Sequence, residues 1–467
     1  MNLKLALLLA SLTLLPLSLK AQMASTVQVW LTTVDRSALF ACQTTPLPYA
    51  GSKLQPITID VNEKQRFQSI DGFGVALTGG SAELLMRMAP ERRAALLRDL
   101  FATEGNDIGI SYLRVSIGSS DMNSRVYSYD DLAAGATDVE LAKFSLDPDR
   151  GDVIPALKEI LAINPKIQIL GSPWSAPAWM KTNDNAKGGS LKPGYYDAYA
   201  KYFVNYVEGM KAEGVAITAI TVQNEPLNPK NTPSMVMFAK EQGEFIKSHL
   251  GPAFEKAGIK TKILLYDHNP DVPSYPLSIL KDPEASKYVD GTAFHLYGGP
   301  SSVLSEVHDA FPNKALYFTE QSVTEPKDAT TIDIAEPVGR VLIGATRNWS
   351  RNVLLWNLAA DPNNGPHTNN GGCTECRGAI TLDGSEVTRN VAYYAIAHFS
   401  KFVLPGSVRI GSNNPEQLPN VAFLTPDGKM VVVVSNTSNF PKTFDIRFRG
   451  KAVTASLPSE SVGTYIW

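Results

Sequence analysis

Residues 217–227 read Ile-Thr-Ala-Ile-Thr-Val-Gln-Asn-Glu-Pro-Leu, and the fold can be worked out from this stretch. Its apolar, β-branched first half leaves almost no solvated face, which is typical of a parallel strand covered on both sides. Gln223, Asn224 and Glu225 then place three polar side chains at its carboxyl end, and Pro226 ends it because proline cannot donate to a ladder. Barrel enzymes carry their chemistry at this end of their strands. Taken alone, a Glu-Pro pair after a core strand is more often an ordinary loop acid, so the functional interpretation needs a second acid elsewhere.

Seven further apolar segments repeat this pattern along the chain. Counting from Gly72, the sequence predicts strands at 72–76, 112–115, 167–171, 215–222, 263–267, 292–295, 315–320 and 353–356. Helical patterns are predicted at 81–101, 154–163, 193–213, 234–250, 334–349 and 390–401. Eight strands alternating with helices favour a closed (β/α)8 TIM barrel over an open doubly wound sheet, and the sequence has no Gly-x-Gly-x-x-Gly nucleotide loop. The predicted fold class is therefore α/β.

The two ends of the chain have a different pattern, with apolar and polar residues in alternation. Strands are predicted at 26–31 and 56–61 near the start and at 421–424, 429–435, 443–448 and 462–467 near the end. Neither group is large enough for a domain of its own, so we expect both to pair into one all-β sandwich side domain. The predicted boundaries are 22–66 for its N-terminal strands, 67–401 for the catalytic barrel and 402–467 for its C-terminal part.

Residues 1–21 have the pattern of a signal peptide. One early lysine precedes an apolar run from Leu5 to Leu19, Pro16 interrupts that run, and Ala21 offers a small residue for cleavage. An uncleaved anchor helix is the alternative, although the run is short for a membrane span. We expect export to the periplasm, the cell surface or the medium, with no membrane insertion once the signal is cleaved.

Length and charge narrow the possible partners. A chain of 467 residues suffices for one barrel-sized domain and a smaller one. Its net charge is −3 and it has no basic runs, so we expect no nucleic acid or other polyanion as a partner. The sequence does not indicate the oligomeric state.

The chain has three cysteines, of which Cys373 and Cys376 form a Cys-x-x-Cys in a stretch rich in Gly and Asn. No second pair or flanking histidine is present to complete a zinc site, and export favours oxidation. We therefore expect a possible disulfide that closes a small loop. Cys42 stands alone, and no role is assigned to it.

Glu320 is the second acid that the interpretation requires. It ends the seventh predicted strand as Glu225 ends the fourth, and the ends of these strands face each other across the mouth of a closed barrel. Two carboxyls roughly 5 Å apart are what retaining glycoside hydrolysis requires, one as nucleophile and one as acid/base. The acid/base must be protonated, so we expect its pKa to be raised by burial and by the neighbouring carboxylate.

The remaining strand ends are rich in aromatic and polar side chains. Apolar faces of a sugar ring stack on Trp, while its hydroxyls need Arg, Asp, Asn and His. Each residue alone has an ordinary structural explanation; His295, for example, is more often a hydrogen-bonded core histidine than a ligand. Their joint position predicts a sugar-binding cleft. Its candidate residues are Arg114, Asp121, Trp174, Trp179, His295, Tyr297, Trp356 and Asn357.

These segments together resemble glycoside hydrolase family 30, which includes glucosylceramidase and the microbial β-1,6-glucanases. The similar segments run in family order over nearly everything after the signal. They are Asp71-Gly72-Phe73-Gly74, Leu113-Arg114-Val115, the run from Ser172 to Lys181, Gln223-Asn224-Glu225-Pro226, His295-Leu296-Tyr297, Phe318-Thr319-Glu320, the run from His398 to Phe402 and Tyr465-Ile466-Trp467.

The resemblance implies a role for each candidate residue. Glu225 would be the acid/base and Glu320 the nucleophile, and Asn224 would bind the sugar 2-hydroxyl. The positions that would line the sugar subsite are Arg114, Asp121, Trp174, Asn224, His295, Tyr297 and Trp356. No cofactor is needed for this chemistry, and no metal cluster is expected.

Some positions differ from glucosylceramidase. Leu355 stands where that enzyme has Asp, Leu296 stands where it has Trp, and the loop 369–378 resembles the glucanase branch. We therefore predict a secreted retaining hydrolase of β-linked glucose, with β-1,6-glucan as the favoured substrate. An exo-β-glucosidase or glucosylceramidase is one alternative. A non-catalytic glycan-binding barrel is another, although both carboxylates are present.

Overall fold

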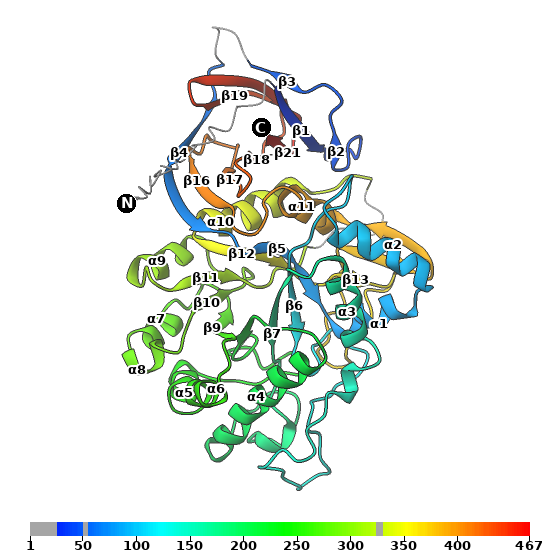
Figure 1. The fold of residues 1–467 in the computed structure, drawn as a ribbon, viewed down its shortest axis with the longest axis vertical. Coiled ribbons are helices and arrows are strands. Elements are labelled where there is room, and N and C mark those ends of the chain that lie inside the picture. Colours follow the sequence, from blue (N-terminus) through cyan, green and yellow to red (C-terminus); the bar gives the residue numbers. More distant parts are fainter. Residues whose placement is uncertain (1–25, 50–54, 324–329) are drawn as a thin grey trace, which may run out of the picture.

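The computed structural model describes residues 26–49, 55–323 and 330–467, and it consists of a barrel joined to a β-sandwich (Figure 1). The predicted signal segment, 1–21, lies outside the described residues. None of the described helices is both long enough and apolar enough to cross a membrane.

The barrel is closed, and its eight strands are all parallel. Its strands are β5 (Gly72–Leu77), β6 (Tyr112–Ser116), β7 (Gln168–Ser172), β8 (Ala219–Thr221), β9 (Lys262–His268), β10 (Gly291–Phe294), β11 (Ala315–Phe318) and β12 (Ser350–Leu355). Strands β6 to β12 each place one residue in a buried interior layer, composed of Tyr112, Leu170, Ala219, Leu264, Ala293, Tyr317 and Leu354. The predicted TIM barrel is confirmed.

Helices surround the strands, and several differ from the prediction. They are α1 (Gly79–Arg87), α2 (Pro90–Phe101), α3 (Val153–Ile163), α4 (Tyr196–Ala212), α5 (Ala239–Phe245), α6 (Gly251–Ala257), α7 (Ser274–Leu280), α8 (Pro283–Ser286), α9 (Ser302–Ala310), α10 (Gly344–Arg347) and α11 (Val391–Ser400). The single helix expected at 81–101 is wrong: Ala89 precedes Pro90 and takes an extended ψ of 136°, because proline disfavours helical geometry in the residue before it. Between α5 and α6, and before α10, the chain forms π-helical turns at Ile246–Leu250 and Pro337–Ile343.

The starts of one strand and one helix were also predicted wrongly, because backbone amides in the predicted segments donate to carbonyls outside them. The fourth strand spans only Ala219–Thr221, since the Val215 amide donates to the Met210 carbonyl at the end of α4. The helix expected from Ser234 begins at Ala239, because the Ser234 and Val236 amides donate to carbonyls of the loop 186–189. The segment before α5 thus belongs to the loops above the barrel.

The sandwich is built from both ends of the chain, as predicted. Its strands are β1 (Thr26–Thr32), β2 (Ala41–Cys42), β3 (Leu47–Pro48), β4 (Thr58–Ser69), β16 (Val408–Ser412), β17 (Asn420–Leu424), β18 (Met430–Asn436), β19 (Lys442–Phe448), β20 (Lys451–Leu457) and β21 (Ser461–Ile466). β1 pairs with β21, and β4 pairs with both β16 and β19, so neither end could form this layer alone. Sequence patterning missed β16 and β20. It also missed the small sheet of β13 (Ala359–Ala360), β14 (Ile380–Asp383) and β15 (Glu386–Arg389).

Helix α11 lies at the junction of the two parts (Figure 1), and all ten of its residues are buried. His398, in its last turn, contacts the hydroxyls of Thr32 on β1 and Thr464 on β21, both at 2.8 Å. The sandwich is therefore held to the barrel by buried packing, by these neutral hydrogen bonds and by Arg347, which donates to Ser412 and to the Asn420 carbonyl.

Candidate active site

A cleft of about 650 Å³ opens where the barrel strands end. Asp121, Glu225, His268, Tyr297, Glu320 and Trp356 line it, together with residues of the loops 227–231 and 371–376. Glu320 lies two residues beyond β11, and Glu225 lies four beyond β8. The barrel therefore brings the two predicted acids into one cleft.

Arg114, on β6, is the fully buried centre of the polar network beneath the cleft. Its guanidinium donates to Glu320 Oε2 at 2.5 Å and to Asp267 Oδ2 at 2.8 Å. It also donates to Asn224 Oδ1 at 2.7 Å and to Ser172 Oγ at 3.1 Å. A buried cation is stable only when paired, and these bonds fix Arg114 and its partners in one arrangement.

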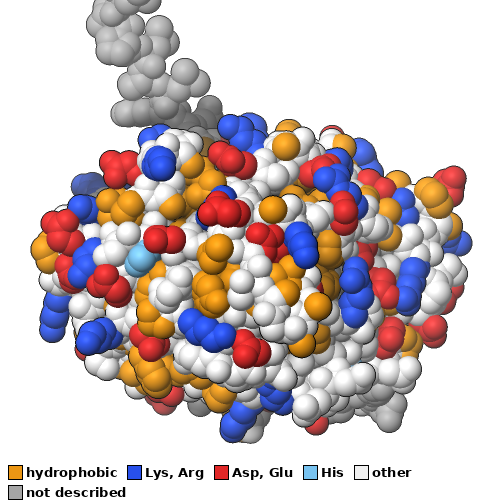
Figure 2. Space-filling view, turned by 90° about the horizontal axis from the view of Figure 1, so that it is seen from below, with side chains coloured by type: hydrophobic (Ala, Val, Ile, Leu, Met, Phe, Trp, Pro, Cys, Tyr) orange, Lys and Arg blue, Asp and Glu red, His pale blue; other side chains and the backbone are white. Residues whose placement is uncertain are grey.

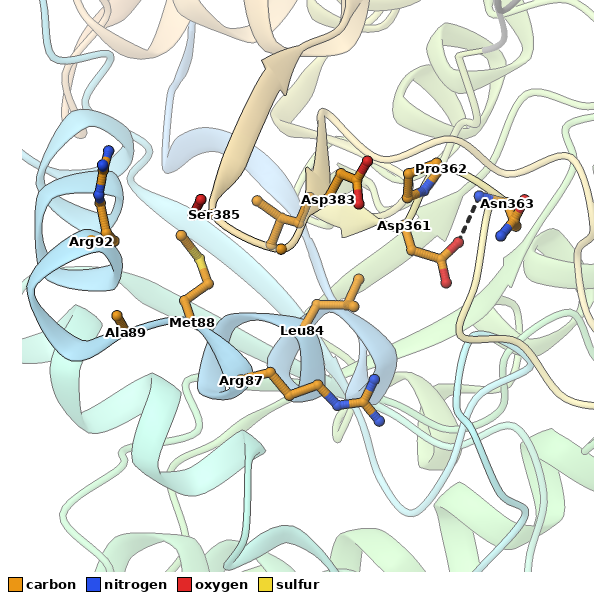
Figure 3. Close-up of a pocket in the computed structure, with 12 residues that line it drawn as sticks. Leu84, Arg87, Met88, Ala89, Arg92, Asp361, Pro362, Asn363, Asp383 and Ser385 are labelled. Carbon is orange, nitrogen blue, oxygen red and sulfur yellow. Dashed lines mark hydrogen bonds between the residues drawn. The ribbon is translucent and has the colours of Figure 1, made fainter.

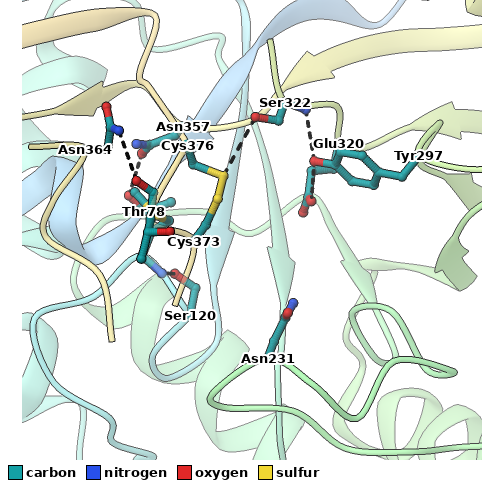
Figure 4. Close-up of a disulfide and its surroundings, with 12 residues drawn as sticks. Thr78, Ser120, Asn231, Tyr297, Glu320, Ser322, Asn357, Asn364, Cys373 and Cys376 are labelled. Carbon is teal, nitrogen blue, oxygen red and sulfur yellow. Dashed lines mark hydrogen bonds between the residues drawn. A yellow bond between two sulfur atoms is a disulfide. The ribbon is translucent and has the colours of Figure 1, made fainter. Parts of the chain in front are cut away.

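Glu320 accepts hydrogen bonds on both carboxylate oxygens. Arg114 bonds Oε2, and the Tyr297 hydroxyl donates to Oε1 at 3.0 Å. The Ser322 amide in turn donates to the Tyr297 oxygen at 2.9 Å, which orients that hydroxyl. Figure 4 shows Tyr297 directed at Glu320, with Ser322 between Tyr297 and the disulfide, where the Ser322 hydroxyl meets Cys376 Sγ at 3.8 Å. These donors hold the carboxylate in place and favour its ionised form.

Glu225 has different neighbours. Its Oε2 accepts from the amides of Asn228 and Asn231, at 2.7 and 3.2 Å, while its Oε1 faces two imidazoles. Its backbone takes a φ of 44°, in a left-handed region that residues other than glycine rarely adopt. Such strain persists only where the surroundings enforce it, and it gathers at functional sites.

His295, fully buried after β10, stands between the two glutamates. Its Nδ1 lies 3.5 Å from Glu225 Oε1 and 3.8 Å from Glu320 Oε1, while its Nε2 lies 3.2 Å from Asp267 Oδ1. Since both glutamate contacts share one nitrogen, these two carboxylate oxygens are no more than about 7.3 Å apart, the sum of the two distances.

The two glutamates titrate in the order opposite to our expectation. Burial raises the pKa of Glu225, but the contact with His295, the charges of His295 and His268 and the Asn228 amide outweigh it and lower that pKa to about 2. Burial raises the pKa of Glu320 above its ordinary value, against the charges of His295 and Arg114. The predicted raised pKa of Glu225 is wrong for this structure.

The pKa of His295 shifts in the opposite direction to that of Glu225. Burial acts against a charged imidazole, but the charge of Glu320 and the contacts with Asp267 and Glu225 raise the pKa of His295 to about 9. A proton moved from His295 Nδ1 to Glu225 Oε1 leaves the total charge of the pair unchanged. The two groups therefore act as one coupled, singly protonated unit.

Asp121 adds another acid to the cleft. Burial, and then the charges of Glu320 and Glu225, raise the pKa of Asp121 to about 8. Near neutral pH its carboxyl is therefore mostly protonated and can donate a hydrogen bond.

Two buried tryptophans stack beside the cleft, and Trp356 lines it. Trp174 and Trp356 stack with ring centres 5.5 Å apart, and Arg114 lies 4.8 Å from the Trp174 ring centre. Trp179 belongs elsewhere, since its indole donates to Asp130 and its ring packs on Tyr195. Asn357 is also structural, because its Oδ1 accepts from Thr78 and Ser81 inside the barrel wall.

The wall opposite Glu320 contains the disulfide of Cys373 and Cys376 (Figure 4), which confirms that prediction. Its loop is tied to neighbouring loops: the carbonyl of Asn370 accepts from Lys187 Nζ and from Thr232 Oγ1. Cys376 also packs with Trp174 and Trp356. Cys42 is exposed on β2, outside this cleft.

The rest of the described surface offers weaker candidates. In Figure 2 basic and acidic side chains alternate, and neither sign forms a continuous field. A second hollow lies beside α1 and α2, next to the turn between β14 and β15 (Figure 3). Its described lining includes Arg87, Arg92, Asp361 and Asp383 but no aromatic ring, so it lacks a surface on which a sugar could stack.

Comparison with known proteins agrees with this geometry. Residues 70–403 match the glycosyl hydrolase family 30 TIM-barrel domain, and residues 406–465 match the family 30 beta sandwich domain. The chain belongs to glycoside hydrolase family 30. It is therefore a glycoside hydrolase, and its sandwich is a regular part of the family 30 architecture.

Individual family 30 proteins are similar over most of their length. An endo-1,6-beta-D-glucanase of Neurospora crassa is 37% identical over 398 residues, which cover 81% of each chain. The lysosomal acid glucosylceramidase of Mus musculus is 31% identical over 440 residues, covering 88% of this chain and 83% of that one. A solved structure of an endo-beta1,6-glucanase is 35% identical with a TM-score of 0.87, covering 95% of this chain and 99% of that one.

The family 30 structure places nine of the eleven candidate residues at one barrel mouth, all but Trp179 and Asn357. Arg114, Asn224, His295, Tyr297 and Glu320 are joined by direct contacts, Glu225 and Asp121 line the cleft, and Trp174 and Trp356 stack beside Arg114. Sequence reasoning missed Asp267, which bonds Arg114, Thr221 and Thr319 and contacts His295. It also missed His268 and Asn228. Asp267 ends a predicted strand, and that position was the one available signal.

Proposed function

We propose that this protein is an exported, retaining hydrolase of β-1,6-linked glucan that cleaves within the chain. The observation that carries the mechanism is the pair of glutamates on either side of His295, one held by a cation and a hydroxyl and the other facing the His295 imidazole. The substrate is inferred from the family 30 relatives named as endo-1,6-beta-glucanases.

In the first step, an ionised Glu320 oxygen attacks the anomeric carbon of the sugar. The bond from that carbon to the leaving oxygen breaks, and Glu225 delivers a proton to that oxygen. Arg114 and Tyr297 hold Glu320 in position, so little reorganisation is needed as its charge moves into the new bond.

The proton reaches Glu225 through His295. Glu320 is the leading charge that raises the pKa of His295, and that charge disappears when Glu320 becomes an ester. The pKa of His295 then falls during attack, which drives the proton toward Glu225 and the leaving oxygen. In the second step, Glu225 takes a proton from water, which attacks the same carbon and frees Glu320.

The spacing of the carboxylates supports retention of configuration. Retaining enzymes hold their two carboxyls about 5–5.5 Å apart, whereas inverting enzymes need about 6.5–9.5 Å to admit a water. The upper bound of about 7.3 Å between the two oxygens leaves little room for the inverting range.

Incubation with a linear β-1,6-glucan tests the substrate and the mode of attack. Early short oligosaccharides are the expected products, and their reducing ends should appear first as the β anomer in a proton NMR time course. Glucose alone would contradict internal cleavage. If the protein released no product from the glucan but cleaved a glucosyl lipid, its activity would instead match that of the glucosylceramidases. An initial α anomer would contradict retention of configuration.

Export is tested on the mature protein. We expect the exported form to begin at Gln22, which an intact-mass measurement would show. A mass that still includes residues 1–21 would contradict cleavage.

A further inference from the structure

We propose that His268, His295 and Glu225 form a binding site for zinc(II), or a similar borderline transition-metal cation, and that the bound cation blocks hydrolysis. This inference goes beyond the proposed function and does not depend on which β-glycoside is cleaved.

The three donor atoms converge on one point of the cleft floor. Glu225 Oε1 lies 3.7 Å from His268 Nδ1 and 3.5 Å from His295 Nδ1, and all three atoms lie within 4.8 Å of one another. Donors bound tetrahedrally at about 2.0–2.2 Å from zinc are about 3.4 Å apart. Two of the three separations are already close to this value, so a small closing movement of His268 completes the geometry.

Within the described residues, the two Nδ1 atoms of His268 and His295 have no partner other than Glu225 and Glu320. His268 Nδ1 and His295 Nδ1 are buried and make no hydrogen bond, and the side chain of His295 is wholly buried. Their distances of 3.7 and 3.5 Å to Glu225 Oε1 are longer than an ordinary hydrogen bond. A cation placed among the three donors would replace the proton on His295 Nδ1 and bind both nitrogens and the carboxylate oxygen together.

The surroundings of His295 have the organisation that is usual behind a metal ligand. Its other nitrogen, Nε2, lies 3.2 Å from Asp267 Oδ1, and Arg114, Thr221 and Thr319 fix that carboxylate. Metal-binding histidines commonly donate a hydrogen bond from their second ring nitrogen to a carboxylate, and this bond orients the first nitrogen toward the metal. Here the first nitrogen points to Glu225.

The donor set selects the class of cation. Two imidazoles and a carboxylate suit zinc and its transition-metal neighbours, whereas magnesium and calcium prefer oxygen donors throughout. His268 and Glu225 line the cleft, so a cation can enter from solvent. Bound there, it would hold the oxygen of Glu225 that must deliver the proton, and hydrolysis would stop.

Calorimetric titration of the full-length, metal-stripped protein with zinc chloride tests the site without any substrate. We expect one zinc per chain in the wild type and in His308→Gln, a control on α9 outside the cleft lining. His268→Gln should bind zinc at least about tenfold more weakly, since one of three ligands is lost. Glu225→Gln, which keeps the side-chain shape, should weaken binding as well.

Activity on an aryl β-glucoside gives a second measurement. Zinc should inhibit the wild type, a chelator should restore its rate, and His268→Gln should resist inhibition relative to its own zinc-free rate. Magnesium should have no effect on either protein. Equal zinc affinity in the wild type and His268→Gln would overturn the proposal, as would no binding by the wild type up to about 1 mM zinc.

Discussion

The barrel mouth and the junction between barrel and sandwich each contain a fully buried histidine, and the pKa values of the two shift in opposite directions. At the mouth, burial is outweighed by the charges of Glu320, Asp267 and Glu225, and the pKa of His295 rises to about 9. At the junction, His398 faces two threonine hydroxyls and the edge of Phe40, and burial lowers its pKa to about 3.

The difference shows that burial alone does not decide whether a side chain is charged. The groups that face it decide, because a buried ion is tolerated only beside its counter-ion. The mouth concentrates charge, because Glu225, Asp267 and Glu320 all face His295 there. At the junction, His398 meets only the neutral hydroxyls of Thr32 and Thr464. Substitutions at the mouth should therefore change activity, and substitutions at the junction should change stability.

The largest effect is expected from Glu320→Gln. The amide keeps the size of the side chain but cannot attack the sugar, so kcat should fall by about 10⁴-fold or more on every β-glucoside. Azide added to Glu320→Gly should restore turnover and yield an α-glycosyl azide, which NMR identifies. Near-normal turnover by the folded Glu320→Gln variant would refute its role as nucleophile.

Glu225→Gln should have a smaller effect that depends on the substrate. Loss of the general acid is expected to cost about 10²–10⁴-fold on glucan, whose sugar leaving group needs a proton. An activated aryl glucoside needs no such proton, so formation of the covalent intermediate should be much less affected and a burst of phenolate should appear. Equal losses on both substrates would show that Glu225 is not the acid.

Tyr297→Phe should reduce activity less than either change of a glutamate. It removes the hydroxyl that donates to Glu320, and a hydrogen bond to a charged group contributes about 1.5–3 kcal/mol, or about 10–100-fold in kcat/KM. Tyr288→Phe is a matched control on the surface, where the hydroxyl meets Glu255. If both variants kept the wild-type kcat/KM, the Tyr297 hydroxyl would have no part in holding the nucleophile.

The sequence was sufficient to predict that the two glutamates meet at the mouth, but not all of their neighbours or how they share charge. Glu225 and Glu320 were predictable because each follows an apolar strand, and a parallel barrel brings all such ends together. The pKa order of the two glutamates was not predictable, since it depends on the contacts of Glu225 with His295 and His268 and on the burial of Glu320, which only the folded chain creates.

Some predicted helix boundaries were wrong for a related reason. The break at Pro90 follows from a local rule and was visible in the sequence. The late start of α5 was not, because the Ser234 and Val236 amides bond to a loop almost fifty residues earlier in the chain. Periodicity reports which residues are apolar, but it does not report which distant carbonyl a backbone amide will meet.

The smallest effect on activity is expected at the junction, from His398→Gln. In the folded wild type His398 has a pKa of about 3 and is neutral, whereas in the unfolded chain it takes up a proton below its ordinary pKa of about 6.5. Its contribution to stability is therefore complete above about pH 6.5 and is lost as the pH falls toward 3. Between pH 7 and pH 5 this linkage should cost the wild type about 2 kcal/mol of unfolding free energy.

Urea titrations test this prediction. The unfolding free energy of His398→Gln should decline less steeply over this pH range, while its kcat/KM at pH 7 stays near the wild-type value. If the unfolding free energy of His398→Gln depended on pH as steeply as that of the wild type, His398 would not be the group that links stability to pH. A large loss of activity would show that the junction also affects catalysis.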